Sequence, residues 1–137
     1  MYRFIRGDET AIRRFFEKRS EKKGFTSLIN AFSANFEGDH KKSLLEIKRS
    51  KKYLKFRSLP DILSLSSYEA LGNISEQKKI FEGFLKDKNT MSMGLFGLIK
   101  IKLAEGDTSL ALKLTKKLIG LKPKNISFQN FSFFHHF

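Results

Sequence analysis

The fold is decided by a stretch that reads Leu103-Ala-Glu-Gly-Asp-Thr-Ser-Leu-Ala-Leu-Lys-Leu-Thr-Lys-Lys-Leu-Ile-Gly-Leu-Lys-Pro123. A glycine, a capping residue, an apolar stripe and a proline are typical of a tight turn followed by an amphipathic helix that ends before the proline. The same pattern occurs upstream at Gly38-Asp39 and Gly72-Asn73, and successive turn glycines are 34 residues apart. A period of about 34 residues is typical of tetratricopeptide hairpins, so the sequence predicts an all-α fold of helical hairpin repeats, an α-α solenoid.

The glycine period divides the chain into three parts. A basic amphipathic helix is expected within residues 1–23, with its start at Asp8 to Thr10. Three hairpins are expected within residues 24–125. The tail, 126–137, is expected to fold back as a cap over the last helix, and a disordered tail is the alternative. The predicted helix pairs are 25–37 with 40–54, 59–71 with 74–86, and 91–104 with 108–121.

Apolar residues at helical spacing predict the core. The helix from 91 to 104 is apolar nearly all round, which is typical of an inner helix, and Gly94 and Gly97 within it indicate a close approach of another helix. Asp39, Asp61 and Asp107 are expected to cap helix starts. The first hairpin should bury a stripe of Phe25, Leu28, Ile29, Phe32 and Phe36 against Leu44, Leu45, Ile47 and Leu54. The last helix should leave an open flank of Leu110, Leu114, Leu118 and Leu121 for the tail to cover.

The composition gives the chain a strong positive charge. The formal net charge is +13, and residues 1–57 carry 16 basic against 7 acidic side chains. Such a field attracts nucleic acid or an anionic membrane face, and the alternative is a merely solubilising surface. The chain has no cysteine, no apolar run long enough to span a membrane and no secretory leader, so we expect a cytoplasmic protein.

Several short motifs resemble one family. They are Lys23-Gly-Phe-Thr-Ser-Leu28, Phe36-Glu-Gly-Asp39, Leu71-Gly72, Met93-Gly-Leu-Phe-Gly-Leu98, Glu105-Gly-Asp107 and Leu121-Lys-Pro123. Over roughly residues 10–125 the chain resembles the N-terminal tetratricopeptide region of the HemY family, proteobacterial inner-membrane proteins associated with haem biosynthesis. The resemblance implies a truncated member that organises tetrapyrrole-pathway proteins, peripheral at the inner membrane. It does not imply the unrelated flavin-dependent oxidase activity that shares the family's name, because no Gly-x-Gly-x-x-Gly turn is present.

No residues form a catalytic or metal-binding pattern. His40 is expected in a turn, and His135 and His136 are adjacent rather than four apart, so they cannot present two imidazoles to one metal from one helix face. The aromatic residues Phe25, Phe32, Phe81 and Phe96 stand at helical spacing and are expected in the core rather than as base-stacking surfaces. The sequence therefore predicts a protein that is not an enzyme and that uses no cofactor.

Two functions from different classes remain. The favoured one is an interaction scaffold whose concave surface binds a protein partner. The alternative is a polyanion-binding module for RNA or an anionic membrane surface, with nucleic acid the less favoured ligand; a decayed gene product is the third possibility. The expected contacts with a protein partner are Phe32, Asn35, Ser66, Glu69 and Lys100. The expected contacts with a polyanion are Lys41, Lys42, Lys48, Arg49, Lys51, Lys52, Lys55 and Arg57.

Overall fold

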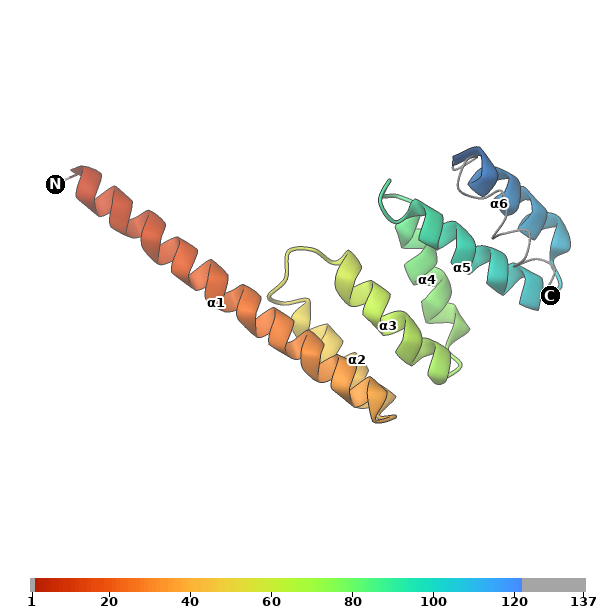
Figure 1. Ribbon diagram of the computed structural model, residues 1–137, viewed down its shortest axis with the longest axis horizontal. Coiled ribbons are helices and arrows are strands. Elements are labelled where there is room, and N and C mark those ends of the chain that lie inside the picture. Colours follow the sequence, from red (N-terminus) through yellow and green to blue (C-terminus); the bar gives the residue numbers. More distant parts are fainter. Residues whose placement is uncertain (1, 122–137) are drawn as a thin grey trace. The chain divides into compact units, whose positions relative to one another are not determined.

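Helices make up most of the chain that the structure describes. The computed structural model describes the backbone of residues 2–121 and the side chains of residues 9–121. Within this range it contains helices and turns but no strand, which confirms the all-α class. The helices, labelled in Figure 1, are α1 (Tyr2–Phe36), α2 (His40–Ser50), α3 (Ser58–Ala70), α4 (Ile74–Phe84), α5 (Met91–Ala104) and α6 (Thr108–Leu121).

The three turn glycines end helices as predicted. Gly38, Gly72 and Gly106 have φ angles of +86°, +69° and +81°, a region that residues with a Cβ rarely adopt. The next N–H then folds back onto the preceding helix, as where Asp39 N donates to Ala34 O at 2.8 Å. The glycine period therefore marks the ends of α1, α3 and α5, while the stacking of hairpins into a solenoid stays a prediction.

The chain forms two compact units, Met1–Asn73 and Ile74–Phe137. The boundary lies between α3 and α4, which are the two helices of the predicted second hairpin. The pairing of these two helices is therefore also still a prediction, and each unit is described by itself.

In the first unit, α2 packs along α1, and α3 packs on α2. Leu28, Ala31 and Ile47 are buried at the centre, and three leucines, Leu44, Leu54 and Leu63, pack around them. A polar cluster joins the three helices beside this core. Asn35 Nδ2 donates to Ser66 Oγ at 2.9 Å, while Asn35 Oδ1 accepts from Ser67 Oγ at 3.1 Å and lies 2.6 Å from His40 Nδ1.

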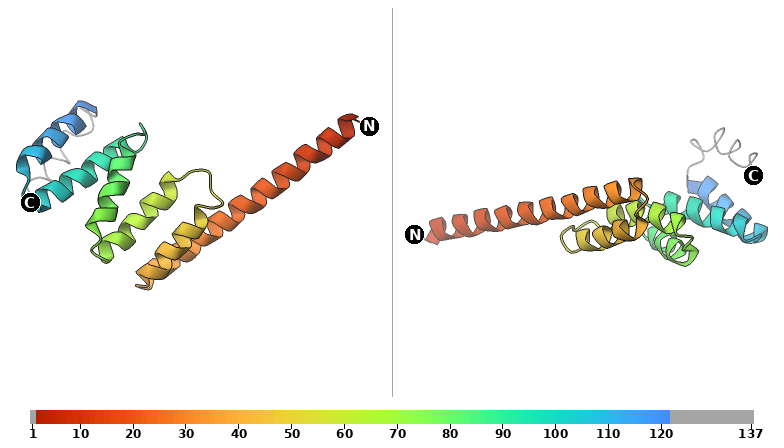
Figure 2. Two further views of the ribbon diagram at one scale, coloured as in Figure 1. Left: turned by 180° about the vertical axis from the view of Figure 1, so that it is seen from behind. Right: turned by 90° about the horizontal axis from the view of Figure 1, so that it is seen from below.

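Helix α1 corrects two predictions about the N-terminal part. It runs without a break from Tyr2 to Phe36, so it neither starts at Asp8 to Thr10 nor ends before Gly24. Gly24 instead allows a close contact, because a Cβ at this position would lie 2.6 Å from Leu54 Cγ. Figure 2 shows the N-terminal half of α1 extending past the end of α2.

The expected apolar stripe of α1 is wrong in most of its members. Of its five residues only Leu28 is buried, and the others are exposed, as is Leu45 on α2. The reason is that α2 approaches the side of α1 that carries Ser27, Ala31 and Ala34, which are small enough for close packing. The large side chains at 25, 29, 32 and 36 point away from that contact.

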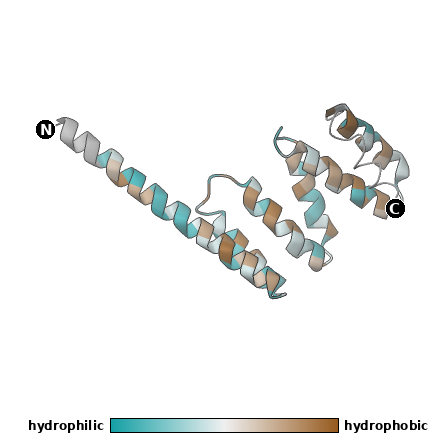
Figure 3. Ribbon diagram, viewed as in Figure 1, coloured by the Kyte–Doolittle hydropathy of each residue, from teal (hydrophilic) through white to brown (hydrophobic). Residues whose placement is uncertain are grey.

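In the second unit, α5 contacts both α4 and α6. Leu95 and Ile99 are buried with Leu118 of α6, which confirms the inner position of α5, and Figure 3 shows its apolar character along most of its length. Gly94 and Gly97 lie against α4, as the sequence predicts: a Cβ at Gly97 would overlap the Phe81 ring. Phe84 is buried as well.

Two further predictions need correction. Leu114 and Leu118 do not form an open flank of α6, because they pack into the core beside α5. Asp61 does not cap α3, since it lies in the first turn and pairs with Lys51 at 2.6 Å, whereas Asp39 and Asp107 do accept from backbone N–H groups of α2 and α6. The tail from 126 to 137, with His135 and His136, lies outside the described residues.

Candidate functional site

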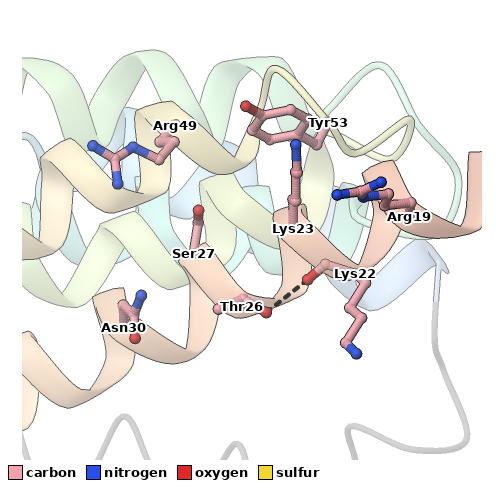
Figure 4. Close-up of a pocket in the computed structure, with 8 residues that line it drawn as sticks. All are labelled: Arg19, Lys22, Lys23, Thr26, Ser27, Asn30, Arg49 and Tyr53. Carbon is pink, nitrogen blue, oxygen red and sulfur yellow. Dashed lines mark hydrogen bonds between the residues drawn. The ribbon is translucent and has the colours of Figure 1, made fainter. Parts of the chain in front are cut away.

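A groove opens between α1 and the C-terminal end of α2. Its volume is about 430 Å³, and its walls carry cationic and neutral polar side chains but no carboxylate. Figure 4 shows Lys23 extending from α1 toward the Tyr53 ring, while Lys22 points to the other side of the helix. We call this the basic groove, and its lining is Arg19, Lys22, Lys23, Thr26, Ser27, Asn30, Arg49 and Tyr53.

The helical spacing of α1 and one close contact explain how the groove forms. Arg19, Lys23 and Ser27 are four residues apart, so they follow one side of the helix. The Leu54 side chain lies over Gly24, which brings the neighbouring Tyr53 within reach of α1. Lys23 Nζ lies 5.9 Å from the centre of the Tyr53 ring, within the range of a cation–π contact.

The charge of the groove is only partly balanced. Arg49 forms one long ion pair with Glu46 at 3.4 Å, and its side chain stays 63% exposed. Arg19, Lys22 and Lys23 contribute three more positive charges from neighbouring turns of α1, and Thr26 already donates its hydroxyl proton to Lys22 O at 2.8 Å. Clustered cations in a partly enclosed surface raise the local concentration of anions, and arginine in particular matches the geometry of phosphate.

A second hollow lies nearby and has a different character. Its volume is about 420 Å³, and Tyr53 also lines it. Its charges include both signs, with Arg13 and Lys55 facing the same space as Glu17 and Glu21. This hollow has no excess of positive charge and serves as an internal comparison for the basic groove.

The structure does not gather the predicted polyanion residues into one site. Of the eight, only Arg49 lines the basic groove, and Lys55 lines the mixed hollow. Lys51 is bound to Asp61. Lys41 and Lys48 are exposed, seven residues apart on α2, and lie away from the buried side that carries Ile47. The remaining three residues, Lys42, Lys52 and Arg57, are also exposed.

Four of the five residues predicted to bind a protein partner lie in the first unit, and the fifth lies in the second unit. Asn35 and Ser66 bond to each other inside the first unit, so their polar groups hold helices together. Phe32 and Glu69 are exposed in that unit, and Lys100 is exposed on α5 of the second unit. The predicted polyanion contacts did not include Arg19, Lys22, Lys23 and Tyr53, because the cations before Gly24 were assigned to a separate basic helix. The four-residue spacing of Arg19 and Lys23 was the available signal.

Other kinds of site have no support in the part of the chain that is described. Between residues 9 and 121, no three His, Asp or Glu side chains come together in a way that could hold a metal ion. None of the helices within residues 2–121 has both the length and the apolar character needed to cross a bilayer. His40 sits at the start of α2 as a structural partner of Asn35.

Comparison with known proteins finds no matching family model, no matching curated protein and no matching solved structure. The relation to the HemY family and to haem biosynthesis therefore stays a prediction based on the sequence motifs.

Proposed function

We propose that this protein is a non-catalytic helical module that binds the phosphate groups of a polyanion in its basic groove. The observation that supports the proposal is one hollow whose lining includes Arg19, Lys22, Lys23 and Arg49 but no carboxylate. The formal net charge of +13 gives the same sign to the long-range field. Such a field steers polyanions toward the protein before any contact forms.

The groove residues have distinct tasks in this proposal. Arg19 and Arg49 offer planar guanidinium groups that can hold a phosphate through two parallel hydrogen bonds. Lys23 supplies a point charge, and the Asn30 amide can donate to a further phosphate oxygen. Tyr53 holds Lys23 in place through the ring contact, and its ring leaves one wall of the groove apolar.

Binding to a phosphate polymer tests the proposal directly. The probes are a labelled single-stranded RNA oligonucleotide and inorganic polyphosphate, each titrated with the full chain over a range of salt concentrations. The test variant combines Arg19→Gln, Lys23→Gln and Arg49→Gln. We expect weaker binding and a salt slope that falls by about 0.7 to 0.9 for each phosphate that the variant no longer neutralises.

The matched control removes the same charge from elsewhere. Lys41→Gln, Lys48→Gln and Lys52→Gln change three exposed lysines outside the groove, so the net charge falls equally. We expect this control to bind more tightly than the groove variant. Equal losses in both variants would mean that only the overall charge matters and would overturn the groove as the binding site.

The scaffold function implied by the HemY resemblance is a weaker proposal. Two of its five expected contact residues, Asn35 and Ser66, have their side chains engaged within the first unit. The geometry therefore favours the basic groove over a concave surface for a protein partner.

A further inference from the structure

A row of large apolar side chains lies exposed on α1. Phe25, Ile29, Phe32 and Phe36 are 49%, 68%, 60% and 91% exposed, respectively. They follow one another at steps of four, three and four residues, so they share one stripe of the helix. Four large apolar residues in one row are more than the scattered apolar residues of an ordinary surface, and they indicate a binding face.

The stripe continues toward the N-terminus with cations. Lys22, Lys18 and Arg14 precede Phe25 at steps of three, four and four residues, and all three are exposed. Glu21 precedes Phe25 by four residues and lies beside these cations, and it also lines the mixed hollow with Glu17 and Tyr53. We call the combined row from Arg14 to Phe36 the outer face of α1; it pairs a cationic half with an apolar half.

We infer that the outer face of α1 lies on an anionic lipid bilayer. This inference rests on the proposed function and names the source of the phosphate groups, because Lys22 belongs to both the outer face and the basic groove. In this arrangement Phe25, Ile29 and the two following phenylalanines enter the boundary between headgroups and acyl chains. The cations of the outer face, Arg14, Lys18 and Lys22, contact the lipid phosphates, as in interfacial amphipathic helices.

Charge complementarity favours an anionic bilayer over a second copy of the chain or RNA as the partner of the outer face. A second copy of the chain would bring Arg14, Lys18 and Lys22 against a molecule that carries the same net charge of +13. RNA would satisfy the cations but not the apolar half, since Ile29 has neither a charge for a phosphate nor a ring for a base. An anionic bilayer offers negative headgroups and an apolar layer side by side.

A single-tryptophan reporter tests the position of the face. The chain contains no tryptophan, so Phe32→Trp introduces one fluorophore on the outer face, and Phe56→Trp introduces one at another exposed position. Each full-length variant is titrated with vesicles of phosphatidylcholine alone and of equal parts phosphatidylcholine and phosphatidylglycerol. We expect a blue shift and quenching by brominated acyl chains only for Trp at 32 and only with the anionic vesicles.

Affinity for the same vesicles gives the second readout. The test variant combines Ile29→Gln with Phe32→Gln, and the control combines Leu45→Gln with Phe56→Gln; all four residues are exposed, so folding is retained in each case. We expect the test variant to bind at least about tenfold more weakly, because two large apolar side chains no longer transfer from water into the bilayer. The control should bind like the parent.

The outcomes separate this inference from the proposed function. If the outer-face variant binds vesicles as tightly as the parent while the groove variant of Arg19, Lys23 and Arg49 loses RNA and polyphosphate binding, the inference is wrong and the proposed function stands. Equal binding to neutral and anionic vesicles, or an apolar face that instead dimerises the protein in sedimentation, would also overturn it. If the groove variant keeps full polyphosphate binding while the outer-face variant loses vesicle binding, the proposed function fails.

Discussion

Helices α1 and α5 both present small residues where a neighbouring helix comes closest, yet they treat their large apolar residues differently. In α1 the contact with α2 uses Ala31 and Ala34, and the large residues on the opposite side stay exposed. In α5, Gly94 and Gly97 accept α4, and Leu95 and Ile99 are buried with Leu118 of α6. The share of a helix surface that its neighbours cover, rather than the apolar content of the helix, therefore decides which residues form the core.

The largest effect expected from this difference is on stability. Leu95→Ala removes a side chain that is 0% exposed, and it should lower the free energy of unfolding by about 2 to 5 kcal/mol. Ile29→Ala truncates a side chain that solvent already reaches, so the change should stay within about 0.5 kcal/mol. Chemical denaturation followed by circular dichroism measures both. A similar loss of stability in the two variants would contradict the difference between α1 and α5.

Two glycines in the second unit provide a smaller and more specific test. Gly97→Ala introduces a Cβ that overlaps the Phe81 ring, and overpacking of this kind should cost about 1 to 3 kcal/mol. Gly83→Ala adds the same methyl group to α4 where nothing lies within 4 Å, so it should stabilise the helix by about 0.5 kcal/mol. Thermal unfolding should therefore shift in opposite directions for the two variants; shifts of the same sign would contradict the close approach of α4 and α5.

The smallest effect concerns the charges at the end of α5. Lys78 Nζ lies 2.8 Å from Glu105 Oε1, and Lys102 Nζ lies 3.1 Å from Glu105 Oε2. The hydrogen bonds from Lys78 and then Lys102 hold the pKa of Glu105 below its ordinary value, and the bond with Glu105 raises the pKa of Lys78. Glu105 therefore stabilises the folded state above its unfolded pKa, and this contribution is lost as the pH falls through the folded pKa.

Lys78 acts at the opposite end of the pH range. Its contribution is present below its unfolded pKa and is lost as the pH rises through the raised folded pKa. Lys78→Met should move the pKa of Glu105 back toward its ordinary value in a carboxyl NMR titration. The control Lys79→Met changes a lysine that pairs with Glu76, and it should leave the pKa of Glu105 unchanged. If the pKa of Glu105 is unchanged in Lys78→Met, Lys102 alone sets it.

The sequence predicted local structure well because its signals are local. A positive φ at Gly38, Gly72 and Gly106 depends on the absence of a Cβ, so the turn positions could be recognised without knowing the neighbours. The apolar excess of residues 91–104 likewise indicated an inner helix. The caps at Asp39 and Asp107 followed from the position of each residue directly after its turn glycine.

The predictions that were wrong depended on which side of a helix contacts its neighbour. The pattern of α1 contains two stripes, one large and apolar and one small, and the sequence offered no reason to prefer the small one as the contact with α2. The basic groove was missed for a related reason: a helix boundary was expected at Gly24, whereas this glycine accommodates Leu54 and brings Tyr53 beside Lys23. Contacts between segments about thirty residues apart are not encoded in the periodicity of either segment.

The N-terminal part of α1 depends on its own helix–coil equilibrium, because none of the other described helices packs on it. Residues 9–19 are exposed throughout, so mainly local backbone hydrogen bonds hold this segment in helical form. The packed turns from Gly24 onward act as the helix nucleus, and the segment before them only propagates the helix, at little gain or loss of free energy per residue. Amide exchange should therefore become faster in steps from Gly24 toward the N-terminus. The substitution Ala11→Gly should unwind the residues before it and leave the helix from Gly24 onward intact.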